Sequence, residues 1–181
     1  MDIKTTLSDS RLHKNAVDGI VDDIIAGNVD VAMLWELTNS DDPRLSWHSV
    51  WVLEALCKKD RKQLLPYQRR VVEIITKTKT KTKTKTKTKT KTESGELRLW
   101  LNISLMLLPE LEEIDVDLLN FSFDNICNMR MAVAMRAVCV KIAHQFCKRE
   151  PELLKELQAV LSMLNLKDEP PAMKSVVKKI L

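Results

Sequence analysis

The sequence predicts an all-α fold, and three observations support this prediction. Apolar residues recur at the helical spacing in most parts of the 181-residue chain. Glycine occurs only three times, and the chain holds one Tyr and three Phe, whereas a β-sandwich usually needs more turn glycines and more aromatic strand residues. Leu, Ala, Met, Glu and Lys, which all favour helices, are frequent throughout.

Composition indicates a globular domain with a core of its own. Hydrophobic residues make up 45% and charged residues 30% of the chain. No apolar run approaches the roughly 20 residues of a membrane-spanning helix, and the N-terminus lacks the apolar region of a secretory signal. We expect one domain over residues 1–181, located in the cytoplasm, with its four cysteines reduced.

The first expected helix carries the clearest apolar stripe. Residues 8–10 offer side chains that can cap its N-terminus, and Gly27 offers a left-handed end. Asn28 is expected to cap a short second helix that turns Val29, Met33, Leu34 and Leu37 inward. The stripe of the first helix consists of Leu12, Ala16, Val17, Ile20, Val21, Ile24 and Ile25.

The third and fourth helices follow a turn-forming cluster, residues 39–43. Asp42 is a suitable cap and Pro43 suits the first helical position, so we expect a helix from there to about Lys59. A break over residues 60–66 then leads into a fourth helix, whose inner face includes Tyr67 and Val71.

Alternating Lys and Thr fill residues 77–92 and contribute eight lysines. Neither face of a strand in this segment would be apolar, and threonine disfavours helix, so the sequence predicts a flexible, solvated loop at residues 76–94. Without these eight lysines, Lys+Arg falls from 29 to 21 against 25 Asp+Glu, which leaves the body at −4. The excess of positive charge therefore belongs to one segment.

Five further helices are expected after the Lys-Thr segment. The helix over residues 128–147 is apolar on nearly every side, so it should be central and buried on several sides. Prolines mark the starts of the last two helices, at Pro151 and at Pro170–Pro171. The expected ranges are residues 95–108, 116–127, 128–147, from 151 onward, and from 171 onward.

An internal repeat appears at an offset of 90 residues. The segment LCKKD at residues 56–60 aligns with FCKRE at residues 146–150, and Val50 then falls on Val140. After subtraction of the roughly 16 inserted residues, two units of about 37 residues each remain, the length of a two-helix repeat. Two unrelated helical hairpins that align by chance are the alternative.

The repeat carries a family resemblance. The stretch NSDDPRLSWHSVWVLEAL, with the later LLPY and the run over residues 133–157, resembles small bacterial HEAT-like repeat proteins. The resemblance implies a short right-handed α-α superhelix of about four helix pairs plus a C-terminal helix. Some similar proteins bear an adenylosuccinate lyase label, but this chain lacks the catalytic loop of that enzyme, and the activity is not carried over.

We expect no metal site, no cofactor and no catalytic constellation. His144 and Cys147 lie three residues apart, but local spacing does not supply four ligands. Cys57 and His48 lie too far apart on one helix to form a nucleophile–base pair. The acidic residues 110–117 fit a solvated turn before a helix. Three scattered glycines cannot form a phosphate-binding loop.

Two residue classes could form a binding surface. Trp35, Trp47, Trp51 and Trp100 are expected to pack in the core, with an exposed aromatic anchor as the alternative. Arginines recur at roughly repeat spacing and could line one face, where they would hold an acidic peptide or a nucleic-acid backbone; the alternative is solvated helix faces with ion pairs between repeats. This possible partner-binding face consists of Arg69, Arg70, Arg98, Arg130 and Arg136.

The most favoured function is a non-catalytic binding or scaffold module that takes a protein or peptide partner in a helical-repeat groove. The alternative is a nucleic-acid-binding protein resembling the HEAT-like alkylpurine DNA glycosylases. It ranks lower because the body is net acidic and because no carboxylate with neighbouring aromatic residues can be placed in a basic groove. An enzyme with a non-local site ranks last.

Overall fold

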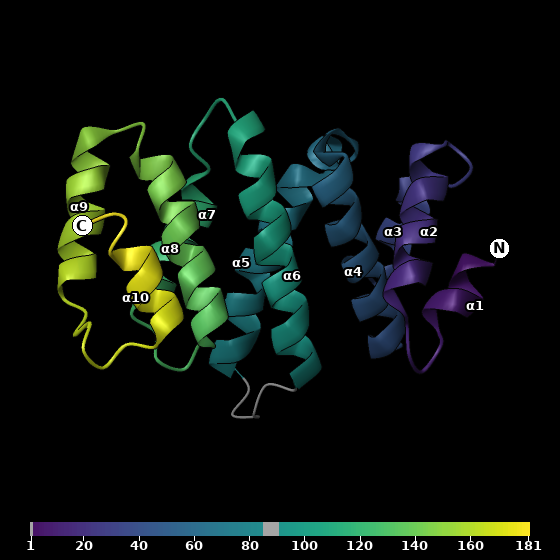
Figure 1. Ribbon diagram of the computed structural model, residues 1–181, viewed down its shortest axis with the longest axis horizontal. Coiled ribbons are helices and arrows are strands. Elements are labelled where there is room, and N and C mark those ends of the chain that lie inside the picture. The colour runs from purple at the N-terminus through teal and green to yellow at the C-terminus, as the bar shows by residue number, and fades with distance from the viewer. Residues whose placement is uncertain (1, 85–90) are drawn as a thin grey trace. The chain divides into compact units, whose positions relative to one another are not determined.

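Helices account for all the regular secondary structure that we describe. The computed structural model describes residues 2–84 and 91–181, with side chains at residues 2–77 and 95–181. Over these residues it contains ten α-helices, two short 3-10 helices and no strand (Figure 1). The predicted all-α fold is confirmed. None of these helices is long and apolar enough to cross a lipid bilayer.

Contacts divide the chain into two compact units, and the expectation of one continuous domain stays a prediction. Unit 1 covers Met1–Val71 and Lys87–Leu107. Its central helix is α4 (Pro43–Lys59), whose Val50, Val52 and Leu53 are fully buried. Packed against α4 are α1 (Ile3–Leu7), α2 (Lys14–Ile25), α3 (Val31–Leu37), the 3-10 helix η1 (Arg61–Tyr67) and α6 (Lys91–Leu107).

Helix ends in unit 1 follow the sequence signals only in part. As predicted, Asp42 caps α4 by accepting a hydrogen bond from the amide of Arg44 at 2.9 Å, and Pro43 is the first helical residue. Gly27 has the predicted left-handed backbone, with φ +77°. The prediction for Asn28 is wrong, because Asp30 caps α3 through the amide of Ala32 at 2.8 Å. Met33 does not face inward as expected but is exposed, whereas Leu34 is buried.

The helix α1 was not predicted, because its five residues are too few to show a periodic stripe. The first of the residues expected to cap α2 instead ends α1: Ser8 follows α1 and donates its hydroxyl to the carbonyl oxygen of Lys4 at 2.8 Å. The residue before α2 is His13, which makes no side-chain capping bond. The prediction that residues 8–10 cap α2 is therefore wrong.

Unit 2 covers Val72–Thr86 and Leu108–Leu181, and α8 (Val133–Cys147) lies at its centre. As predicted, α8 is buried on several sides, by contacts with three other helices. It begins later than residue 128 because a turn intervenes, in which the amide of Met131 donates to the carbonyl oxygen of Asn128 at 2.9 Å. The other elements are η2 (Leu108–Glu110), α7 (Val116–Ile126), α9 (Pro151–Ser162) and α10 (Pro171–Val177).

The Lys-Thr segment departs from the loop predicted at residues 76–94. The helix α5 (Gln68–Thr84) continues into the segment, and α6 already begins at Lys91. The loop prediction is therefore wrong at residues 76–84 and 91–94, while residues 85–90 lie outside the described part. An ion pair stabilises α5 where the Lys-Thr segment begins. The ammonium group of Lys77 lies 3.3 Å from the carboxylate of Glu73, one helical turn earlier.

Burial patterns support the internal repeat. Nine of the ten buried residues of α4 fall on buried residues of α8 when the numbering is shifted by 90. Val50 and Val140 are both fully buried, and so are Leu53 and Ala143. Both helices end within the aligned segments LCKKD and FCKRE, α4 at Lys59 and α8 at Cys147. The two helices therefore occupy equivalent positions in two related repeats.

Candidate partner-binding face

Three aromatic rings from separate elements stack inside unit 1. Trp35 of α3 contacts both of the other rings: its ring centroid is 4.6 Å from that of Tyr67 and 5.3 Å from that of Trp100. The interplanar angles are 16° and 27°, so both pairs are stacked. Trp35 and Trp100 are buried, and Tyr67 at the end of η1 is half-buried. The stack therefore runs from the core of unit 1 toward its surface.

An arginine covers this stack. The guanidinium carbon of Arg70, on the first turn of α5, lies 5.3 Å from a ring centroid of Trp35, and Arg70 is exposed. A cation above an indole face is attracted by the negative potential of the ring. Because buried aromatic packing fixes Trp35, the contact restricts where the charge of Arg70 can lie. The arrangement is a partly ordered cation at the protein surface.

Arg69 and Arg98 are the other two predicted arginines in unit 1. Both are exposed, on α5 and α6 respectively. We call Arg69, Arg70 and Arg98 the unit 1 arginines. In unit 2, Arg130 is exposed in the turn before α8.

Arg136 does not lie on any surface, and its prediction as a partner-binding residue is corrected. Its side chain is 1% exposed. Two of its nitrogens donate to the carboxylate of Glu169, at 2.7 and 3.0 Å, and its Nε donates to the carbonyl oxygen of Ile126 at 2.8 Å. Sequence reasoning placed Arg136 by repeat spacing alone, and spacing cannot show that a distant carboxylate satisfies a buried guanidinium.

The remaining tryptophans pack on one another across one turn of α4. The ring centroids of Trp47 and Trp51 are 5.8 Å apart, and both side chains are half-buried. Core packing is thus confirmed for Trp35 and Trp100, whereas Trp47 and Trp51 are intermediate between core and surface.

Three of the four cysteines and His48 are buried in the manner of packing residues. Burial raises the pKa of Cys57 and of Cys147 to about 11, and that of Cys139 to about 12, so these thiols are protonated at neutral pH. His48 is buried, with its Nδ1 2.7 Å from the carbonyl oxygen of Leu7. Burial lowers the pKa of His144, with a smaller contribution from the charge of Lys148. Across residues 2–84 and 91–181, no group of three potential metal ligands comes together.

The acidic residues before α7 lie in the expected turn. Asp115 caps α7 by accepting a hydrogen bond from the amide of Leu118 at 3.0 Å. Arg149 donates to the carbonyl oxygens of Glu112 and Leu108, both at 3.4 Å, and so links this turn to the residues that follow α8.

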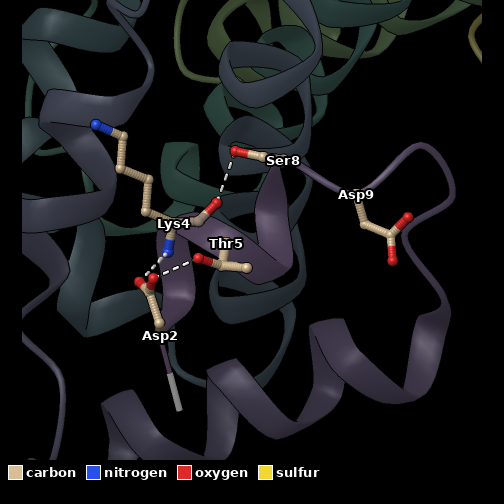
Figure 2. Close-up of a pocket in the computed structure, with 5 residues that line it drawn as sticks. All are labelled: Asp2, Lys4, Thr5, Ser8 and Asp9. Carbon is tan, nitrogen blue, oxygen red and sulfur yellow. Dashed lines mark hydrogen bonds between the residues drawn. The ribbon is translucent and has the colours of Figure 1, made fainter.

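A pocket at α1 is lined in part by groups that cap the helix. It is lined by Asp2, Lys4, Thr5, Ser8 and Asp9, and Figure 2 shows the first two of these joined through the amide of Lys4. Asp2 accepts from that amide at 3.1 Å and from the hydroxyl of Thr5. The Thr5 hydroxyl is also the main cause that lowers the pKa of Asp2. The pocket is a helix start, with no further arrangement that indicates a ligand.

Sequence reasoning did not predict that the carboxylates of Glu54 and Glu169 are buried. Glu54 accepts from Asn102 at 3.1 Å and from Lys58 at 2.6 Å. A signal was present, since Glu54 lies on the apolar side of α4, one residue after Leu53 and four after Val50. Glu169 has no such pattern, because it precedes two prolines in a turn.

Comparison with known proteins places the chain in a family. The family model described as a HEAT repeat domain matches residues 3–181, nearly the whole chain. No curated protein and no solved structure matches it. The match agrees with the helical fold, with the repeat at offset 90 and with the resemblance seen in the sequence. The chain is a member of the HEAT repeat domain family.

Proposed function

We propose that this protein is a non-catalytic binding module and that Arg69 and Arg70 hold an acidic segment of a partner protein. HEAT repeat domains are typically protein-interaction scaffolds, which sets the general class. The observation that carries the more specific proposal is the position of Arg70, exposed and 5.3 Å from a ring centroid of the buried Trp35.

Arginine is suited to this task for two physical reasons. Its planar guanidinium donates two parallel hydrogen bonds to a carboxylate, which a lysine cannot do. A side chain that is already restrained also loses less conformational entropy when a partner binds. The cation–π contact with Trp35 provides such restraint, worth about 0.5–1 kcal/mol at an exposed site. Arg, Tyr and Trp are also the residues most often found at the energetic centres of interfaces.

The size of the charged surface favours a short acidic segment over nucleic acid. Stable duplex binding commonly uses a row of about 6–10 phosphate contacts. Within unit 1 the proposed site rests on the unit 1 arginines, with Arg70 the one held in place by an aromatic stack. Arg130 of unit 2 is a separate candidate contact for a longer partner. Two or three arginines match the carboxylates of a few neighbouring Asp or Glu residues.

The test compares two ligand classes in a background that removes a known confounder. The eight lysines of residues 77–92 attract any polyanion, so all eight are replaced by Gln in every protein tested. Fluorescence anisotropy then measures the binding of a labelled ten-residue acidic peptide, a composition-matched neutral peptide and a short DNA duplex. We expect preference for the acidic peptide and loss of that preference in the double variant Arg69→Ala/Arg70→Ala.

Two outcomes would overturn the proposal. Equal binding of the acidic and neutral peptides would show that carboxylates are not recognised. Tighter binding of the duplex, lost in the double variant, would assign the arginines to nucleic acid. Circular dichroism of each variant confirms that it is folded.

The cytoplasm is the compartment that we propose. All four cysteines are free thiols, and three of them are buried with raised pKa values. Free buried thiols are typical of proteins that work in a reducing environment.

A further inference from the structure

Equivalent positions of the two repeats make equivalent hydrogen bonds. Ser46 of α4 donates its hydroxyl to the carbonyl oxygen of Thr38, at the end of α3, at 2.8 Å. Arg136, the equivalent residue of α8, donates its Nε to the carbonyl oxygen of Ile126, at the end of α7, also at 2.8 Å. The last carbonyls of a helix lack partners within that helix. In each repeat, the fourth residue of the central helix therefore donates a hydrogen bond to one of these carbonyl oxygens.

Arg136 differs from Ser46 because it reaches beyond this carbonyl. Its guanidinium makes a two-bond ion pair with Glu169, and the side chains are 1% and 6% exposed. Glu169 lies between α9 and α10 and is followed by two prolines. The ion pair thus joins the central helix of unit 2 to the segment that leads into α10.

Apolar packing and one further hydrogen bond also hold this segment in place. We call residues 163–181 the C-terminal strap. Its helix α10 has only seven residues, too few to be stable alone. Met173 and Val177 are fully buried, and α10 packs on α8 (Figure 1). Beyond these contacts, Gln158 of α9 donates to the carbonyl oxygen of Ile180 at 3.3 Å.

We propose that Arg136 and Glu169 form a latch that keeps the C-terminal strap closed over α8, and that the strap opens as a unit while the rest of unit 2 stays folded. A charge left without its partner in the interior is strongly unfavourable. The intact ion pair therefore favours the closed strap. In a variant that lacks one partner, local opening would bring the remaining charge closer to water without unfolding α7 and α8. Opening also uncovers the apolar surface of α8 that Met173 and Val177 cover.

Hydrogen exchange on the full chain, followed by mass spectrometry, tests this latch. In the unmodified protein, amides of α10 should exchange by an opening that depends little on denaturant and should be less protected than those of α7 and α8. Glu169→Gln should speed exchange in α10 by about tenfold or more, the effect of weakening a buried charge-assisted hydrogen bond. Exchange in α4 should not change. The matched control is Glu152→Gln, which removes the exposed pair with Lys155 on α9.

A second pair of variants separates the latch from general loss of packing. Arg136→Met leaves Glu169 buried without a partner, so α10 should exchange faster still. The double variant Arg136→Met/Glu169→Met removes both charges and should return α10 exchange toward that of the unmodified protein, because apolar side chains can replace a buried ion pair. Equal protection of α10, α7 and α8 in the unmodified protein would overturn the proposal. So would exchange in the double variant at least as fast as in Arg136→Met.

Discussion

Glu54 and Asn102 lie 48 residues apart in the sequence and share a 3.1 Å hydrogen bond between α4 and α6. The second carboxylate oxygen of Glu54 accepts from the ammonium group of Lys58 at 2.6 Å, one helical turn along α4. Glu54 is buried, whereas Lys58 keeps more than half of its side chain in solvent. A buried carboxylate satisfied on both oxygens thus joins two helices of unit 1.

Removal of this carboxylate should destabilise the protein. We expect Glu54→Ala to lower the free energy of unfolding by about 1–3 kcal/mol, because Asn102 loses its acceptor in a partly buried place. Glu54→Gln keeps one acceptor oxygen and should lose less. Urea denaturation followed by circular dichroism measures both variants. Glu73→Gln, which removes the more exposed pair with Lys77, serves as the control, and an equal loss in the control would contradict the account.

Two glycines should respond to alanine in opposite directions. Gly19 lies inside α2 with no atom within 4 Å of where a Cβ would stand, so Gly19→Ala should stabilise by about 0.5–1 kcal/mol. Gly27 has φ +77°, so Gly27→Ala should destabilise by about 1–2 kcal/mol. Thermal and urea unfolding of the two single variants give the comparison. Changes of the same sign would refute the assignment of the α2 end.

Thiol labelling should separate one cysteine from the other three. Cys57, Cys139 and Cys147 are buried, and burial raises their pKa values to about 11, about 12 and about 11. At pH 8 they are therefore protonated and shielded, while Cys127 is exposed. Iodoacetamide treatment of the native protein, followed by peptide mass spectrometry, should modify Cys127 first. Early modification of Cys139 would contradict its buried position.

The same pKa values set the sign of a pH effect on stability. The folded state holds the protons of these thiols more tightly than the unfolded state, for which the usual pKa is 9.0. Their contribution is thus fully present below pH 9 and is lost as pH rises from 9 toward 12. Urea unfolding at pH 8 and at pH 10.5 should show a smaller loss of stability in Cys139→Ala than in the unmodified protein. An identical loss in both proteins would show that Cys139 is not a cause.

Deletion of residues 77–92 should change stability little. The buried residues nearest to the segment, among those with described side chains, are Ile75 before it and Leu97 after it. The cost of closing a connection depends only weakly on its length, so we expect a change below about 1 kcal/mol. Differential scanning calorimetry measures it. A large loss of stability would show that the Lys-Thr part of α5 and α6 contributes to the core after all.

Periodicity and capping residues were enough to predict most of the fold. The Asp42–Pro43 start of α4 and the burial of α8 follow from local patterns, and the structure confirms them. The stripe of α2 is confirmed at Val17, Ile20, Val21 and Ile24, whereas Ile25 is exposed. The helix α1 escaped because a single turn has no measurable period. The Lys-Thr segment was misassigned near its ends, where adjoining helices extend into residues whose own preferences oppose helix.

The candidate site was less accessible to sequence reasoning. Exposure of Arg69 and Arg70 fits the prediction from residue type, but the stack that positions Arg70 joins α3, η1 and α6 and leaves no local pattern. Arg136 is also an arginine at the expected spacing, yet it is buried and paired with the carboxylate of Glu169, 33 residues away. Contacts between distant segments decide which of these arginines is exposed and which is buried.

The affinity of the acidic peptide for the single variant Arg70→Ala tests the central claim most directly. It is measured in the background without the eight lysines, beside the matched control Lys155→Ala, which removes an exposed charge from α9 of unit 2. We predict about tenfold weaker binding for Arg70→Ala, since a hydrogen-bonded charge pair contributes about 1.5–3 kcal/mol, and unchanged binding for the control. Equal dissociation constants for the two variants would contradict the account.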